Sequence, residues 1–498
     1  LQELKTQTEP GKPGRYSLKS LNDGEIKSRQ PSFNGRQTII RLDDGVHLIK
    51  LNGSKDEVAA FVNLNGNNTG KNDTFGIVKE ANVNLNADEW KKVLLPWTVR
   101  GPDNDNKFKL INRESDKYSQ RYRIRENGNR DLGDIVNSPI VAVGGYLATA
   151  ANDGMVHIFK KNGGSDERSY NLKLSYIPGT MGRKDIENQD STLAKELRTF
   201  AEKGYVGDRY GVDGGFVLRQ VNLNGQDRVF MFGAMGLGGR GAYALDLSKI
   251  NGNYPAAAPL FDVKNGDKNG KNGKNRVEVE LGYTVGTPQI GKTRSGKYAA
   301  FLASGYAAKD IGSGDNKTAL YVYDLNNTLG TPIAKIEVKD GKGGLSSPTL
   351  VDKDLDGTVD IAYAGDRGGN MYRFDLSDND PNKWSVRTIF EGRKPITSAP
   401  AVSRLADKRV VIFGTGSDLT EEDVVDTTEQ YIYGIFDDDK GTVKVTVQNG
   451  TGGGLLEQTL TKENKILFLT NNKASGGSNG KGWVVKLRDG ERVTVKPT

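Results

Sequence analysis

A repeating pattern of short strands constrains the fold of this chain more than any other feature. Each of four similar units begins with a small residue and a proline, in the segments NSPIVAV (Pro139), GTPQIGK (Pro288), SSPTLVD (Pro348) and SAPAVSR (Pro400). An apolar strand follows each start, and an aromatic-rich strand such as MVHIFKK or NMYRFDLSD closes the unit. Units of three or four antiparallel strands are typical of the blades of a β-propeller, whose ring closure removes exposed sheet edges.

The number of units predicts an all-β fold, a modified seven-bladed β-propeller with a few short helices and long loop insertions. Two more units share the later part of the pattern: one contains RVFMFGAMGLGGRGAYALDLSK, and the last contains KILFLTNN before GWVVKLRDG. These make six units from Asp134 onward, and a seventh is expected from QTIIRLDDGVHLIKL and EVAAFVNL. We therefore expect residues 1–34 to be an N-terminal extension or linker and residues 35–498 to be one propeller domain.

The composition agrees with this fold and excludes several kinds of site. The 498 residues include 63 glycines and 35% hydrophobic residues, a mixture that suits many short strands joined by turns. Only DSTLAKELRTFAEKG and NADEWKKVLLPW have a helical pattern, and both are expected to be insertions. The chain has no cysteine, which excludes disulfides, thiolate catalysis and cysteine-based metal sites.

Charge and hydropathy indicate which partners to expect. A formal net charge of +7, from 70 basic and 63 acidic residues, is spread thinly and does not indicate nucleic acid binding. The basic, glycine-rich segment Lys264–Arg276 is expected to be a hairpin tip, with polyanion binding as the alternative.

No apolar run approaches the roughly 20 residues of a transmembrane segment. The opening LQELKTQTEP has no signal-peptide pattern, so we expect a piece of a longer protein.

The strongest site signal is the segment DKDLDGTVD, Asp352–Asp360, which places aspartates at positions one, three, five and nine. Like charges this close repel each other unless a cation lies between them. Alternate residues of a tight loop point their oxygens toward one centre, Gly357 permits the turn, and an all-oxygen ligand set favours Ca²⁺. The predicted ligands of one calcium ion are Asp352, Asp354, Asp356, the carbonyl of Thr358, and Asp360.

This loop differs from an EF-hand, because position twelve is Tyr363 rather than glutamate and a strand follows instead of a helix. Since the loop by itself can nearly fill the coordination shell, a structural or conformational site is favoured over a catalytic one. A solvated acidic turn is the alternative. The only histidines are His47 and His157, and His157 is expected to be a strand residue.

No motif indicates an enzyme. GKTRSGKY, from Gly291, has the glycine and lysine spacing of a phosphate-binding loop, but Tyr298 replaces the serine or threonine and a strand follows. GLGGRG, residues 236–241, matches a dinucleotide fingerprint, yet the strand AYALDL follows it. Both are interpreted as turns between strands. Without a nucleophile elbow or paired histidines, we expect no catalytic residues and no organic cofactor.

Two segments resemble a known family. NRDLGDIVNSPIVAVGGYLATAANDGMVHIFK (Asn129–Lys160) and SSPTLVDKDLDGTVDIAYAGDRGGNMYRFDL are similar to the C-terminal region of PilC-type type IV pilus proteins, which are pilus-tip-associated adhesins and biogenesis factors of Gram-negative bacteria. The resemblance covers most of the chain from about Gly35. It implies a modified seven-bladed propeller with one calcium ion, bound here by Asp352, Asp354, Asp356, Thr358 and Asp360.

The resemblance also implies a function in which calcium acts as a switch: the loaded form opposes pilus retraction and supports surface pili, twitching motility, virulence and adhesion to host epithelial cells. The implied partners are pilus components such as minor pilins, and a host-cell receptor. The implied location is the bacterial surface, at the pilus tip or the outer membrane.

Two alternatives remain open at this stage. One is a generic secreted sugar- or protein-binding propeller. The other is a quinoprotein dehydrogenase, which is disfavoured because those enzymes repeat a tryptophan motif in each blade. The four tryptophans of this chain have no regular register.

Overall fold

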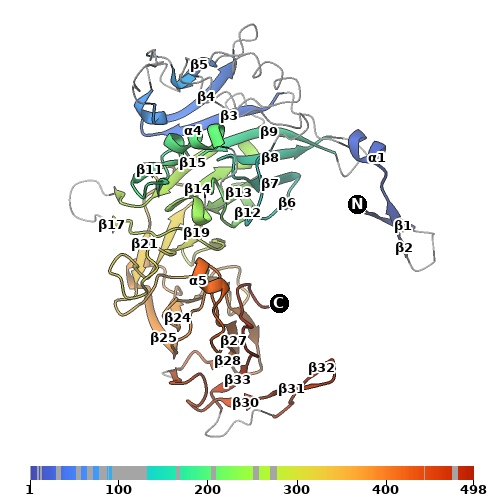
Figure 1. Ribbon diagram of the computed structural model, residues 1–498, viewed down its shortest axis with the longest axis vertical. Coiled ribbons are helices and arrows are strands. Elements are labelled where there is room, and N and C mark those ends of the chain that lie inside the picture. Colours follow the sequence, from blue (N-terminus) through green and yellow to red (C-terminus); the bar gives the residue numbers. More distant parts are fainter. Residues whose placement is uncertain are drawn as a thin grey trace.

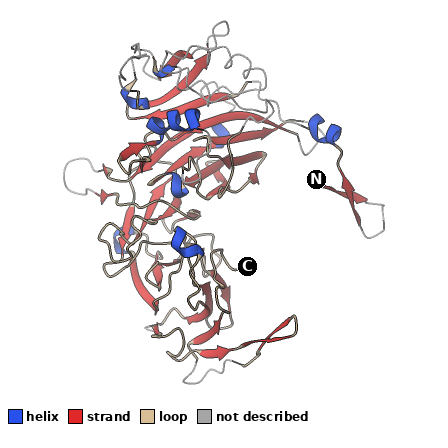
Figure 2. Ribbon diagram, viewed as in Figure 1, coloured by secondary structure: helices blue, strands red, loops and turns tan. Residues whose placement is uncertain are grey.

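The computed structural model describes residues 2–7, 11, 14–29, 35–51, 58–63, 71–77, 87, 89–91, 132–163, 169–203, 209–250, 257–269, 277–441, 444–473 and 480–498. Strands dominate this part of the chain, and the helices are few and short (Figure 2). Successive sheets follow one another along the molecule, from the N-terminal strands β3 (Gln37–Leu42) and β4 (Gly45–Leu51) to the C-terminal sheet (Figure 1).

Five sheets of the described residues each contain four consecutive antiparallel strands, and we name them blades 1 to 5 in chain order. Blade 1 comprises β6 (Val141–Val143), β7 (Tyr146–Ala150), β8 (Val156–Lys161) and β9 (Tyr170–Ile177), and blade 2 comprises β12 (Phe216–Leu223), β13 (Gln226–Ala234), β14 (Gly241–Asp246) and β15 (Pro259–Lys264). Blade 3 comprises β18 (Gln289–Lys292), β19 (Tyr298–Ala303), β20 (Ala319–Asp324) and β21 (Ala334–Glu337). Blade 4 comprises β22 (Thr349–Val351), β23 (Ile361–Gly365), β24 (Asn370–Asp375) and β25 (Ser385–Glu391), and blade 5 comprises β26 (Ala401–Arg404), β27 (Arg409–Gly414), β28 (Tyr431–Asp437) and β33 (Gly482–Lys486).

The remaining strands either extend the sheets of these blades or form separate two-stranded sheets. β29 (Val445–Thr446) pairs in parallel with β25, and β30 (Leu456–Gln458) pairs in parallel with β33. Separate two-stranded sheets are formed by β1 (Gln2–Gln7) and β2 (Arg15–Ser20), β10 (Gly182–Lys184) and β11 (Asp190–Thr192), β16 (Lys268–Asn269) and β17 (Val277–Glu278), and β31 (Leu460–Glu463) and β32 (Ile466–Leu469). The helices are α1 (Asp23–Ser28), α4 (Leu193–Lys203) and α5 (Glu421–Val424), with short 3₁₀ turns η1 (Asp73–Phe75), η3 (Gly236–Gly238), η4 (Leu247–Lys249) and η7 (Pro381–Lys383).

The blades pack face to face, and this explains why their strands are apolar on both sides. Four buried apolar clusters each lie between two consecutive blades. Between blades 2 and 3, for example, the ring of Phe232 lies 6.2 Å from that of Tyr323. Between blades 4 and 5, the ring of Phe390 lies 4.5 Å from that of Tyr433. A strand buried on both faces reads as a continuous apolar run, as in β14 and β23, where every residue is buried.

The innermost strands of consecutive blades lie side by side, and hydrogen bonds join the lead-in segments that precede them. Each bond connects one blade to the next. In blade order the pairs are Asn137 N to Asp213 Oδ1 (3.2 Å), Gly215 N to Gly286 O (2.9 Å), Thr287 N to Ser347 Oγ (2.9 Å), and Ser346 Oγ to Ile396 O (2.6 Å). The small-residue–proline starts identified in the sequence belong to these segments, so the repeat marks the positions where blades meet.

The all-β propeller fold agrees with the sequence prediction, whereas the count of seven blades is not confirmed. The segment QTIIRLDDGVHLIKL does not begin a separate blade: β3 pairs in parallel with β9, so β3, β4 and β5 (Val58–Asn63) extend blade 1. Burial of Ile39 and Ile40 in the same apolar cluster as blade 1 accounts for this pairing. In the last unit, KILFLTNN contributes β32 to a separate hairpin, and GWVVK is β33, the fourth strand of blade 5.

The other predicted elements also have clear outcomes. DSTLAKELRTFAEKG contains α4, which buries Leu193, Leu197 and Phe200 as its apolar pattern predicts. Most of NADEWKKVLLPW, and the tip of the segment 264–276, lie outside the described residues. The two nucleotide-like segments are connections to strands: GKTRSGKY joins β18 to β19, and GLGGRG leads into β14.

The close approach of blades 3 and 4 gives a first prediction. A Cβ atom at Gly286, where φ is +112°, would lie 2.1 Å from Ser347 Oγ. We expect Gly286→Ala to reduce the free energy of unfolding by about 2–3 kcal/mol, from steric overlap and positive φ together. The control is Gly296→Ala, with φ of +89° and no atom within 4 Å of the added Cβ. It should cost only about 1 kcal/mol, and equal losses in chemical denaturation would contradict the proposed overlap.

Candidate metal centre

The four aspartates identified in the sequence lie in the hairpin loop between β22 and β23 of blade 4. This loop spans residues 352–360, whereas the corresponding loops of blades 1, 2, 3 and 5 span only residues 144–145, 224–225, 293–297 and 405–408. The antiparallel pair Val351 and Ile361 closes the base of the loop. The extra length therefore forms a compact projection from an otherwise regular blade.

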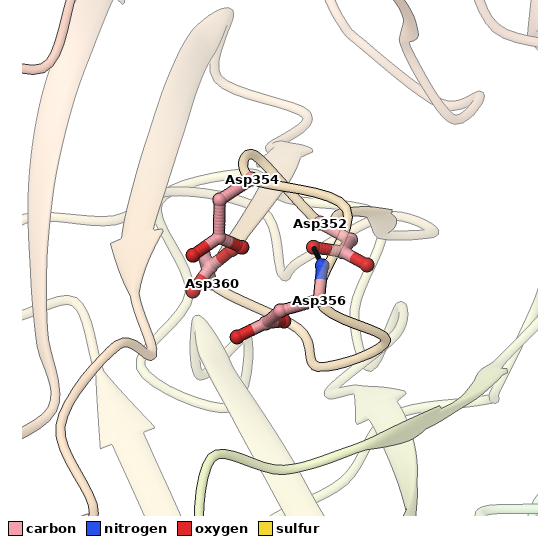
Figure 3. Close-up of side chains that lie close together, drawn as sticks. All are labelled: Asp352, Asp354, Asp356 and Asp360. Carbon is pink, nitrogen blue, oxygen red and sulfur yellow. Dashed lines mark hydrogen bonds between the residues drawn. The ribbon is translucent and has the colours of Figure 1, made fainter.

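The loop brings the four carboxylates together (Figure 3). One oxygen of each of Asp352, Asp354, Asp356 and Asp360 lies within 4.8 Å of the others. Within the described part of the chain, this is the one group of three or more aspartate, glutamate or histidine side chains that is arranged to hold a metal ion. The sequence therefore identified the residues that the structure gathers.

Backbone hydrogen bonds shape the loop around Asp352. Its Oδ1 accepts the N–H of Asp356 at 3.2 Å, and its Oδ2 accepts the N–H of Gly357 at 2.8 Å. Gly357 has φ of +89°, and Leu355 also lies in the left-handed region with φ of +58°. The glycine predicted to permit the turn does so, while the side chain of Leu355 is 81% exposed and takes no part in the core.

Asp360 is the buried member of the group, with only 2% of its surface exposed. Its Oδ2 accepts the N–H of Lys353 at 2.9 Å. Burial raises the pKa of Asp360, and the neighbouring carboxylates of Asp354, Asp356 and Asp352 raise it further. Its negative charge is thus held in an unfavourable environment, which a bound cation would relieve.

Asp356 is more exposed and is held by hydrogen bonds. Its Oδ1 accepts the hydroxyl of Thr358 at 2.7 Å and the N–H of Thr358 at 2.8 Å, and these bonds lower the pKa of Asp356. Its Oδ2 accepts a hydrogen bond from the guanidinium of Arg294 at 2.8 Å. Thr358 therefore fixes the Asp356 carboxylate through its N–H and side chain, while the role of its carbonyl as a ligand stays a prediction.

The loop contacts the blades on both sides. From blade 3, Arg294 pairs with Asp356, and the carbonyl of Lys292 accepts the N–H of Val359 at 2.8 Å. From blade 5, the guanidinium of Arg404 donates to the carbonyl of Lys353 at 3.4 Å, and the Lys353 ammonium lies 3.9 Å from the Asp439 carboxylate. Three blades therefore meet at this one loop.

Arg294 was not among the predicted site residues. The signal was nevertheless present, because GKTRSGKY and DKDLDGTVD follow equivalent innermost strands in consecutive blades. Equivalent hairpins of neighbouring blades lie at the same end of their strands, so their charged residues are expected to meet.

The donor set suits a hard cation. The four carboxylates offer only oxygen atoms, which hard cations such as calcium prefer as ligands. The histidines are placed differently: His157 is fully buried in β8, where its Nδ1 lies 2.8 Å from Ser175 Oγ and its Nε2 lies 2.8 Å from Asp153 Oδ2. The hydrogen bond between His157 and Ser175 joins β8 to β9. Because Asp153, His157 and Ser175 are all buried, none of them has access to a substrate.

Fold and site together define a class of protein, a β-propeller that carries a candidate cation-binding loop in one blade. The family model described as "PilY1 beta-propeller domain" matches residues 132–473. The chain belongs to this family of type IV pilus biogenesis factors. The family predicted from the sequence is thereby confirmed.

Individual relatives agree with this assignment. The type IV pilus biogenesis factor PilY1 of Pseudomonas aeruginosa (strain UCBPP-PA14) is 30% identical over 437 residues, which cover 75% of this chain and 35% of that protein. A PilY1 homolog of Xylella fastidiosa is 27% identical over 320 residues, covering 59% of this chain and 19% of its own length. The chain therefore spans about a third or less of the curated relatives it matches.

A solved structure supports the fold. The crystal structure of the P. aeruginosa PilY1 C-terminal domain matches with a TM-score of 0.52 and 24% identity, covering 70% of this chain and 73% of that one. No helix of the described residues has both the length and the apolar character needed to cross a membrane.

The buried charge of Asp360 gives a second prediction. With metal removed by a chelator, Asp360→Asn should stabilise the protein by more than about 0.5 kcal/mol, because it removes a buried charge while leaving an oxygen to accept the N–H of Lys353. Denaturant unfolding measures this change. Asp407→Asn, in the exposed β26–β27 loop, is the control and should stay within about 0.5 kcal/mol. A clear loss of stability in Asp360→Asn would contradict the idea that this charge needs a cation.

Proposed function

We propose that this chain is the calcium-binding propeller of a type IV pilus biogenesis protein, and that calcium in the loop 352–360 regulates pilus extension and retraction. The observation that carries this proposal is the convergence of four carboxylates within 4.8 Å in a loop that contacts three blades. The predicted ligands are Asp352, Asp354, Asp356, the carbonyl of Thr358, and Asp360.

Electrostatics gives the loop two states. Without a cation, the four carboxylates repel each other and are held together by backbone hydrogen bonds and by Arg294. Calcium would supply the missing positive charge and draw the ligands inward. Because the loop touches blades 3 and 5, a change in its order would alter the surface that these blades present to a partner.

The rest of the proposal follows from family membership. We propose that the protein acts at the bacterial surface, at the pilus tip or outer membrane, with pilus components such as minor pilins as partners and adhesion to a host-cell receptor as a further role. Its role is binding rather than catalysis. Residues 35–498 form its propeller domain, and residues 1–34 are an extension or linker.

Calcium binding gives the third prediction. Calcium titrated into the chelator-treated protein should bind at one site and raise the unfolding free energy, by about 2.7 kcal/mol at a free concentration of 100 times Kd. Asp356→Ala should abolish both the calorimetric signal and the stabilisation. Asp407→Ala, outside the site, should retain both. Binding that is unchanged in Asp356→Ala would place the calcium elsewhere.

The pilus role is tested by the same pair of variants in the full-length protein, expressed in a type IV-piliated bacterium that lacks its own PilY1. We expect Asp356→Ala to reduce surface pili and twitching, because the metal-free form would not oppose retraction, while Asp407→Ala restores both. If Asp356→Ala no longer binds calcium but gives wild-type piliation, the regulatory role is disproved. Calcium binding by the unmodified protein would not be contradicted by that result.

Arg294 gives the fourth prediction, because it occupies one oxygen of Asp356. The side chains of Arg294 and Asp356 are 42% and 35% exposed, so water and salt screen their ion pair and its contribution to stability is small. Arg294→Gln should therefore tighten calcium binding by up to about fivefold and slightly lower the melting temperature of the metal-free protein. Lys297→Gln removes the same charge from the same hairpin and is the control. Weaker calcium binding in Arg294→Gln would show that the arginine supports the metal instead of competing with it.

A further inference from the structure

Three of the five blades carry an added strand beside their outermost strand, and each added strand runs parallel to it. β3 pairs with β9 of blade 1, β29 pairs with β25 of blade 4, and β30 pairs with β33 of blade 5. In blade 2, the guanidinium of Arg41 from β3 donates to the first carbonyl of the outermost strand β15, at Pro259 (3.4 Å). A parallel fifth strand is thus the usual way in which this molecule covers the outer edge of a blade.

Blade 3 differs, because its outermost strand β21 pairs only with β20 among the described strands. The N–H of Val338 donates to the carbonyl of Thr318, next to β20, at 2.8 Å. Successive residues of a strand direct their backbone groups to opposite edges, so Lys335 and Glu337 direct theirs away from β20. The outer edge of blade 3 therefore presents the N–H and C=O groups of these two residues.

A cavity of about 330 Å³ lies along this open edge. One wall consists of residues 333–337, which include the whole of β21. The other wall belongs to blade 4 and comprises Pro381, Asn382, Trp384, Ser385 and Val386. β21 and β25 lie side by side there (Figure 1). The volume is within the range of roughly 300–1,000 Å³ that binding sites occupy, so space for a ligand is available beside the edge.

The walls of this cavity are held in place by the protein itself. Trp384 is only 8% exposed, and its indole N–H donates to the carbonyl of Asp378 at 2.9 Å. Ile336 and Trp384 belong to the same buried apolar cluster. The ammonium of Lys335 donates to the carboxylate of Glu280 at 2.7 Å. An incoming strand would therefore meet a preformed edge, which reduces the ordering cost of binding.

We propose that the outer edge of blade 3 binds an extended segment of another protein, which pairs with β21 as a fifth strand. The segment runs parallel to β21, is rich in β-branched residues and contains no proline in the paired part. Backbone hydrogen bonds to Lys335 and Glu337 supply affinity, and side chains of the segment lie against Trp384 and Val386. This surface is separate from the aspartate loop and does not depend on calcium binding there.

The probe for this edge is the peptide RQTIIRLD, residues 36–43, which contains the strand that β9 accepts in parallel. In the intact protein, strands of the same chain already cover blades 1, 4 and 5 at a high effective concentration, so a free peptide is directed to blade 3. We expect fluorescence anisotropy to show binding with a Kd of about 0.1 mM. Bound peptide should also slow hydrogen exchange in residues 333–338.

Two variants at one position test the pairing. Glu337→Pro removes one N–H of the open edge and should weaken peptide binding at least about fivefold. Glu337→Gln keeps that N–H and is the matched control, which should bind the peptide as the unmodified protein does. Melting temperatures show whether Glu337→Pro is folded, and the hydrogen-exchange measurement on the unmodified protein does not depend on that variant.

A second peptide controls for the probe. It carries Thr38→Pro and Ile39→Pro, and because adjacent residues face opposite edges, one proline interrupts the pairing in either register. The proposal is overturned if RQTIIRLD does not bind, if it binds without slowing exchange in residues 333–338, or if the proline-containing peptide binds equally well. It is also overturned if sedimentation shows a dimer that Glu337→Pro abolishes, because a second copy of the chain would then occupy the edge.

Discussion

The hydrogen bonds between the lead-in segments are the constraint on which the rest of this propeller depends. Four of the five innermost strands have only three or four residues, the exception being β12, so pairing within those blades fixes their position weakly. Bonds such as Gly215 N to Gly286 O and Thr287 N to Ser347 Oγ set the spacing between neighbouring blades directly. The aromatic side chains between the blades can then interlock. Glycine is favoured at position 286, because a Cβ atom there would meet Ser347 Oγ and the backbone has a positive φ.

This arrangement places two different chemical environments at the ends of one strand. Ser347, just before β22, belongs to the wall of a cavity of about 680 Å³ where the lead-in segments of the five blades converge, and Asp352, just after it, begins the aspartate loop. The cavity has a mixed polar and apolar wall with charges of both signs, while the loop concentrates four carboxylates. Since blade 4 is fixed to its neighbours at the cavity end, disturbance of the loop is expected to act mainly on the opposite surface, where Arg294 and Arg404 meet it.

The sequence was informative where the cause of the structure is local. The aspartate spacing and Gly357 determine the loop, and alternation of apolar strands with turns determines the blades. Pairing between distant strands could not be read in the same way. An apolar pattern shows that β3 is a strand but not that it pairs in parallel with β9, and β33 pairs with β28 across a long insertion. Arg294 was missed for the same reason, since 62 residues separate it from Asp356.

Hydrogen exchange measured by mass spectrometry, with calcium and with a chelator, tests the central claim most directly. If calcium orders the loop and thereby ties three blades together, exchange should slow in residues 352–360 and in the adjoining hairpins 293–297 and 405–408. The remote hairpin 144–145 should be unaffected. Equal exchange in the two conditions at 352–360 would contradict the account, and slowing confined to that loop would show that the cation does not reach the neighbouring blades.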